Sequence, residues 1–141
     1  GARWVGHIFR VLHVYDDLID GDRSLTKEEI HQTFWTMLVS LPSDQFFQKH
    51  ASALLPLIVN SIVNWRVAND IEQDEVAPKR ALGVAWILRG AYIDLLSMAL
   101  VLERGPEYAV GVGRLLRDWA HSETFEVYLD NLAKEKAANH V

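Results

Sequence analysis

The stretch from His13 to Asp22, HVYDDLIDGD, ends an apolar run at the beginning of the chain. Gly21 is the residue type that commonly lies just past a helix end. The sequence therefore predicts a first helix from about Ala2 to Asp20 whose last turns carry an acidic cluster. In the run before this cluster the apolar residues recur at the spacing of an amphipathic helix, at Val5, Ile8, Phe9, Leu12 and Tyr15.

The acidic cluster consists of Asp16, Asp17 and Asp20, whose spacing of three and four positions places them on one side of a helix. The C-terminal end of a helix favours cations, and each mismatched charge there costs ~0.3–1 kcal/mol at an exposed surface. Mg²⁺ prefers such carboxylate oxygens and commonly bridges to substrate phosphates. Two interpretations stay open: the three aspartates hold Mg²⁺, or they form a solvated helix end that an Arg from elsewhere neutralises.

His13 followed by Asp16-Asp17-Leu18-Ile19-Asp20 resembles the first aspartate-rich motif, DDxxD, of the class I isoprenoid synthases. This resemblance implies a terpenoid-synthase-like fold and a substrate diphosphate that is bound through Mg²⁺. Carried over by position, Asp16, Asp17 and Asp20 would be the metal ligands. The Arg-Arg-Gly that follows the motif in that family is replaced here by Leu25-Thr26-Lys27, and the nearest Arg is Arg23.

The remainder of the chain has few Gly and Pro residues and no run that alternates long enough for a strand. We therefore predict one all-α domain over residues 1–141, an antiparallel bundle of about five or six helices. A second helix begins with a capping box at Thr26 and has Ile30, Phe34, Met37, Leu38 and Leu41 on its apolar side. Pro42 is expected to end it, and Ser43 to cap the next piece. Three longer helices are expected over Ser52–Gln73, Lys79–Glu103 and Pro106–Lys136.

The expected helix over Ser52–Gln73 is apolar nearly all round, which is typical of a helix that is buried on most sides. Asn60 and Asn64 lie on one face of it, near Asp70 and Asp74. They are interpreted either as a buried amide pair whose hydrogen bonds are satisfied internally, or, with the two aspartates, as a second polar wall opposite the Asp16 cluster.

Arg89 and Asp94 interrupt the expected helix over Lys79–Glu103 at a spacing that does not suit an ion pair within one helix. A buried Arg needs an acidic partner or an anion. Arg89 is therefore predicted either to form a structural ion pair with an Asp at a helix end or to clamp a diphosphate. Arg114 and Arg117, which share a basic face with His121, are further candidates for binding the diphosphate.

A net charge of −5 argues against a nucleic-acid-binding surface, and the lack of Cys excludes thiolate chemistry and suits a cytoplasmic protein. The stretch from Ala81 to Leu102 is long enough to span a bilayer. It contains Arg89 and Asp94, each of which costs ~2.5–3.5 kcal/mol near a bilayer centre. We therefore expect a buried helix and no membrane span.

Three functions stay open. The first is an Mg²⁺-dependent protein of isoprenoid-synthase type, active or degenerate, whose metal ions would act as Lewis acids on a prenyl diphosphate. The second is a non-catalytic helical interaction or structural protein, compatible with a homo-oligomer, in which Trp4 and Trp35 would be exposed at an interface. The third is an all-α nucleotide pyrophosphohydrolase with acids at Glu123, Glu126 and Asp130.

Overall fold

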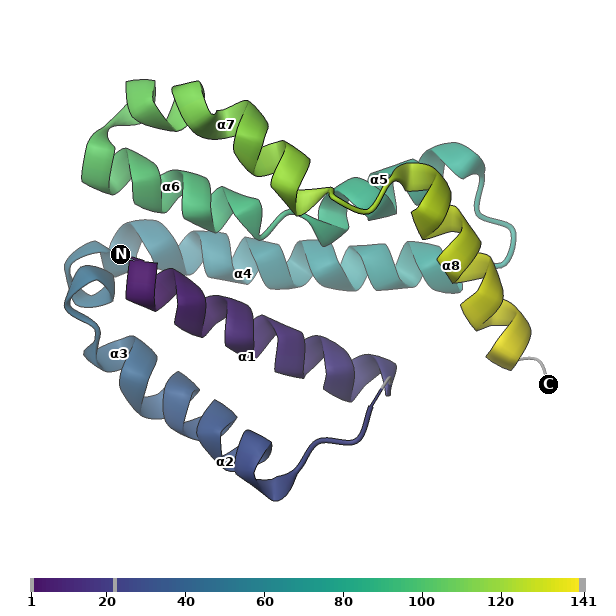
Figure 1. Cartoon of the computed structure of the whole chain (residues 1–141), viewed down its shortest axis with the longest axis horizontal. Coiled ribbons are helices and arrows are strands. Elements are labelled where there is room, and N and C mark those ends of the chain that lie inside the picture. The colour runs from purple at the N-terminus through teal and green to yellow at the C-terminus, as the bar shows by residue number, and fades with distance from the viewer. Residues whose placement is uncertain (1, 22, 140–141) are drawn as a thin grey trace. The chain divides into compact units, whose positions relative to one another are not determined.

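The computed structural model of the protein describes residues 2–21 and 23–139, without the side chains of residues 2 and 20. This part of the chain is built of helices and contains no strand, so the predicted all-α fold class is confirmed (Figure 1). The elements are α1 (Ala2–Asp20), α2 (Lys27–Trp35), the π-helical segment η1 (Thr36–Ser40), α3 (Leu41–Ser43), α4 (Gln45–Gln73), α5 (Lys79–Arg89), α6 (Ile93–Arg104), α7 (Pro106–Ala120) and α8 (Phe125–Asn139).

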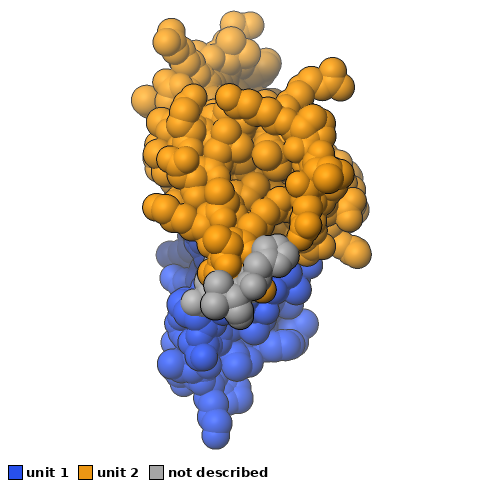
Figure 2. Space-filling view, turned by 90° about the vertical axis from the view of Figure 1, so that its right-hand side faces the viewer, with its two compact units in different colours: residues 1–54 blue, residues 55–141 orange. Residues whose placement is uncertain are grey.

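The chain forms two compact units, Gly1–Leu54 and Leu55–Val141, which Figure 2 shows in blue and orange. The first unit holds α1, α2, η1, α3 and the beginning of α4. The second holds the rest of α4 and all later helices. The single domain predicted over the whole chain stays a prediction, since α4 belongs to both units.

Trp4 on α1 is the centre of the first unit, where it is fully buried. Its ring stacks on Phe47 at 5.7 Å between centroids and lies 6.2 Å from the ring of Phe46. Val5 and Ile8 are buried on the same helix. The expectation that Trp4 is exposed at an interface is wrong, because the unit buries its largest apolar side chain in its own small core.

The capping box at the start of α2 is confirmed. The Glu29 N–H donates to Thr26 Oγ1 at 3.1 Å, and the Thr26 N–H donates to Glu29 Oε2 at 2.8 Å. Pro42 does not end this helix as predicted: it lies in the first turn of α3, where a missing N–H is tolerated. Asp44, and not Ser43, caps α4 by accepting the N–H of Phe47 at 3.1 Å.

In the second unit, both of the long helices predicted after residue 78 are broken in two. The first stops at Arg89 and resumes at Ile93, with a bend of 42°. The second leaves the helical conformation at His121, whose φ is −111° and ψ 44°. The Thr124 hydroxyl then accepts the N–H of Val127 and begins α8. The sequence prediction missed the first break because apolar residues continue through it. It missed the second although the polar residues from His121 to Thr124 interrupt the apolar spacing there.

Two segments of the described chain meet the length and composition of a membrane span: α4, and α5 with α6 taken together across their bend. This is weak evidence, since core helices of soluble proteins can meet the same criteria. The predicted lack of a membrane span therefore stays a prediction.

Candidate functional site

The acidic cluster lies at the C-terminal end of α1, as predicted. Gly21 follows the helix with φ +65°, a conformation that favours glycine, and its N–H donates to the Asp17 carbonyl at 3.0 Å. Asp16 and Asp17 are partly exposed. The side chain of Asp20 lies outside the described residues, so the three-carboxylate site stays a prediction.

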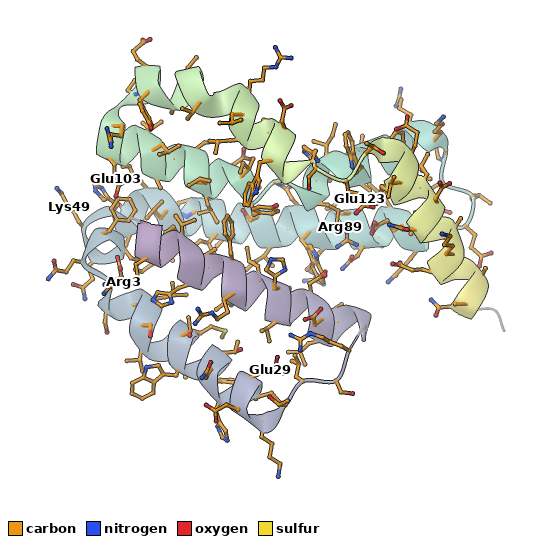
Figure 3. All side chains as sticks on the ribbon, viewed as in Figure 1. Arg3, Glu29, Lys49, Arg89, Glu103 and Glu123 are labelled. Atoms are coloured by element: carbon orange, nitrogen blue, oxygen red, sulfur yellow. The ribbon has the colours of Figure 1, made fainter. Side chains whose placement is uncertain are left out.

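Arg23 neutralises Asp17. Its Nε donates to Asp17 Oδ2 at 2.8 Å, and its Nη1 donates to Glu29 Oε1 at 2.8 Å. The pKa of Glu29, labelled in Figure 3, is below its usual value because the carboxylate accepts the Thr26 backbone N–H and then the Arg23 guanidinium. For Asp17 this is the second of the two interpretations, an acidic helix end paired with an Arg. Such exposed pairs contribute little to stability, because solvent screens them.

Within the part of the chain whose side chains are described, no three His, Asp or Glu residues are grouped so that they could hold a metal ion. Glu123, Glu126 and Asp130, the acids of the pyrophosphohydrolase pattern, therefore do not form such a group. Since the side chain of Asp20 is not among those described, this finding does not extend to the cluster on α1.

Arg89, labelled in Figure 3, is held at the meeting of α4, α5 and α8 in the second unit. Its guanidinium donates to both carboxylate oxygens of Glu72 and to Asn69 Oδ1, and it lies 5.5 Å from the centre of the Trp65 ring. The Tyr128 hydroxyl donates to Glu72 Oε2 at 2.8 Å. Burial and the Glu72 carboxylate both raise the pKa of Tyr128. Of the two roles predicted for Arg89, the structure confirms the structural ion pair, but the partner is Glu72 and not an Asp at a helix end.

The sequence prediction missed Glu72 and Tyr128, the two other members of this network. Glu72 is buried although it is charged. It lies four positions after the buried Ala68, so helical spacing already placed it on the packed side of α4. No local pattern singled out Tyr128, which lies 56 positions further along the chain.

The other two candidate arginines are on α7, and the hydrogen bonds described for Arg89 involve neither of them. Arg117 donates to Asp94 on α6, which confirms that Arg89 and Asp94 have different partners. Arg114 is exposed. The basic face predicted with His121 is divided, because the His121 ring packs on Trp86 at 4.6 Å between centroids. Burial, and then the charge of Arg117, lower the pKa of His121.

The predicted polar wall on α4 points largely to solvent. Asn60, Asp70 and Asp74 are exposed, and Asn64 is partly exposed. The Asp74 carboxylate accepts the N–H of Val76 at 3.0 Å in the turn that follows α4. The interpretation of Asn60 and Asn64 as a buried amide pair is wrong, because this side of α4 is not the side that packs within the second unit.

Apolar side chains also remain exposed on α4, which contradicts the prediction that this helix is buried on most sides. Between Leu55 and Val67 one face of α4 carries apolar residues whose exposure ranges from 38% at Ile62 to 60% at Val59. α7 has a second such edge, where Leu115 is 71% exposed. The exposed apolar residues of these two helices are Leu55, Val59, Ile62, Val63, Val67, Tyr108, Val110, Leu115 and Trp119.

Gly90, at the break between α5 and α6, provides a sharp test of the packing around His121. A Cβ at this position would lie 2.6 Å from His121 Cε1, and the ring is held in place by Trp86. We expect Gly90→Ala to lower the free energy of unfolding by about 1–3 kcal/mol in urea denaturation. Gly111→Ala is the matched control. Gly111 lies within α7, and an added Cβ would meet no described atom within 4 Å. This change should therefore raise the free energy of unfolding by about 0.5–1 kcal/mol. Equal effects of the two changes would contradict this packing.

No protein-family model, no curated protein and no solved structure matches the chain.

Proposed function

We propose that this protein is a non-catalytic helical interaction protein whose exposed apolar helix faces are covered by other chains. The observation that carries the proposal is the exposed face of α4 that holds Leu55, Val59, Ile62, Val63 and Val67, with the exposed Arg66 as a charged residue near its end. Contiguous apolar patches of more than a few hundred Å² are rare on the surfaces of soluble monomers, and they mark interaction sites.

The charged candidates support the same proposal because three of them are already paired. Asp17 has Arg23, Arg89 has Glu72, and Arg117 has Asp94. A diphosphate would have to break the buried pair at Arg89, which leaves Glu72 as an uncompensated charge. These contacts hold helices together within each unit. The main surface that the protein leaves uncovered is then formed by the apolar helix faces.

A calorimetric titration of the full chain with Mg²⁺ and pyrophosphate tests this proposal. We expect no heat of binding from a protein whose circular dichroism shows a folded helical chain. Asp17→Asn is the matched variant, and it should give the same flat titration as the parent chain. Saturable binding that Asp17→Asn abolishes would overturn the proposal.

That second outcome would support the other candidate function, an Mg²⁺-dependent protein of isoprenoid-synthase type. One observation favours it: α1 ends in acidic residues and has no basic residue in its last turn, so the negative end of the helix has no cation of its own. Asp16, Asp17 and Asp20 would hold Mg²⁺ there, and the ions would bind a prenyl diphosphate as Lewis acids. Arg114 is the one candidate arginine for the leaving group that is exposed and has no carboxylate partner among the contacts described above.

A further inference from the structure

The two helix breaks of the second unit lie against each other at His121. The first break is at Gly90, between α5 and α6, and Gly90 is buried. The second begins at His121, where α7 ends. A Cβ on Gly90 would lie 2.6, 2.8 and 3.3 Å from the Cε1, Nε2 and Nδ1 atoms of the His121 ring. The edge of the ring that carries both nitrogens therefore faces the backbone of the first break.

Trp86 on α5 holds the connection between α7 and α8 at three positions. Its ring lies 4.6 Å from the ring of His121 and 5.6 Å from the ring of Phe125, between centroids. Its indole N–H donates to the carbonyl of Glu123, a residue labelled in Figure 3, at 3.1 Å. Phe125 in turn stacks on Tyr128 of α8 at 6.2 Å between centroids. The beginning of α8 is thus fixed to α5 through Trp86, and His121 is the first residue of the connection that makes this contact.

The neutral form of the His121 ring suits this place better than the charged form. A protonated His carries an N–H on both ring nitrogens, and each needs an acceptor. The backbone groups of Gly90, which this edge of the ring faces, are already bonded: its N–H donates to the Ile87 carbonyl and its carbonyl accepts the Ile93 N–H. Protonation therefore places a donor against a backbone whose own hydrogen bonds are made.

The charges near His121 also disfavour a cation. The C-terminal end of α7 attracts one positive charge, but Arg117 already provides it in the last turn. A second positive charge four positions later is repelled. Asp94 on α6 accepts a hydrogen bond from Arg117, so this carboxylate is already paired. Burial, and then the charge of Arg117, accordingly lower the pKa of His121. The other titratable residues within about two turns of Gly90 or His121 along the chain are Arg89, which pairs with Glu72, Tyr92 and Tyr128, whose pKa values burial raises, and the exposed Arg114, Asp118, Glu123 and Glu126.

We propose that His121 is a pH-dependent switch for the docking of α8 on α5. The neutral ring fills the space between Trp86 and Gly90 and keeps the beginning of α8 in place. Protonation puts a charge into this space, beside Arg117, and shifts the equilibrium toward an open state in which the ring has left Trp86 and α8 has separated from α5. This inference goes beyond the proposed function, because it concerns contacts within the second unit and not the exposed apolar faces.

The direction of the pH dependence follows from the pKa of His121. In the closed state this pKa is lower than the ordinary value of 6.5, so the closed state binds fewer protons than the open state does. The docking of α8 is therefore at full strength above pH 6.5 and weakens as the pH falls from 6.5 through the pKa of the closed state.

Amide hydrogen exchange of the full chain, followed by mass spectrometry at about pH 7.5 and about pH 5, tests this switch. After correction for the intrinsic pH dependence of exchange, the protection of the α8 amides should be about three- to tenfold lower at the acidic pH, since a pKa difference of one corresponds to a factor of about ten. Proton NMR follows the ring of His121 itself, and its titration midpoint should lie below 6.5.

Two variants remove the titrating group. His121→Phe keeps a ring between Trp86 and Gly90, and His121→Gln replaces the ring by an uncharged amide. Both should abolish the acid-dependent loss of α8 protection, and circular dichroism verifies that they remain helical. If the phenylalanine variant does not fold, the glutamine variant decides. His31→Gln is the matched control, because His31 is exposed on α2 in the first unit, and it should keep the pH dependence of the parent chain.

Three results would overturn the proposal. The first is equal protection of the α8 amides at both pH values in the parent chain. The second is an acid-dependent loss that persists unchanged in His121→Gln. The third is a titration midpoint of His121 above 6.5, which would mean that the closed state prefers the charged ring.

Discussion

Replacing Glu72 by alanine is expected to lower the free energy of unfolding of the second unit by about 3–5 kcal/mol. Glu72 is buried and accepts hydrogen bonds from Arg89 on α5 and from Tyr128 on α8. Its removal leaves the Arg89 guanidinium without its carboxylate and the Tyr128 hydroxyl without its acceptor. Urea denaturation, followed by circular dichroism, measures the loss.

Asp70→Ala is the matched control on the same helix, because Asp70 is exposed two positions earlier on the other side of α4. It should change the free energy of unfolding by no more than about 0.5 kcal/mol. A double variant, Glu72→Leu with Arg89→Met, should recover much of the loss, since two apolar side chains of similar volume replace the buried ion pair at little cost. If Glu72→Ala costs no more than Asp70→Ala, the network does not hold the three helices together.

Trp4→Ala should cost the first unit about 3–5 kcal/mol of stability, as measured by thermal or urea unfolding. The side chain is fully buried and stacks on Phe47, so its loss opens a large cavity between α1 and the beginning of α4. In a unit this small, such a loss is a large part of the total stability.

Two variants test whether the loss of stability comes from the buried position of Trp4 and not from the removal of a tryptophan as such. Trp4→Phe should cost less than about 1.5 kcal/mol, because it keeps an aromatic ring and removes the indole N–H, which is buried without a hydrogen-bond partner. Trp35→Ala, measured where the chain is monomeric, should change the stability by no more than about 0.5 kcal/mol, because Trp35 is exposed. Equal losses for Trp4→Ala and Trp35→Ala would show that Trp4 is not the centre of a core.

The candidate sites show which charge partners can be predicted from residues that are close in the sequence. The sequence placed Asp17 at a helix end that needs a counter-charge, and Arg23, six positions later, provides it. It also indicated that Arg89 needs an acidic partner, but that partner, Glu72, lies 17 positions away on another helix. Helical periodicity carries no information on which of several acids a distant Arg will reach. The same holds for Arg117 and Asp94, whose contact depends on how α6 and α7 pack.

The sequence by itself determined the properties that act over one or two turns: the all-α class, the capping box at Thr26, and the end of α1 at Gly21. These depend on backbone hydrogen bonds and on side chains within four positions of each other. Only the tertiary structure decided which side of each helix is covered. The α2–η1 segment buries threonines and exposes Phe34, and α4 leaves Val59 exposed, because the covered side depends on which neighbour is present and not on which side is the more apolar.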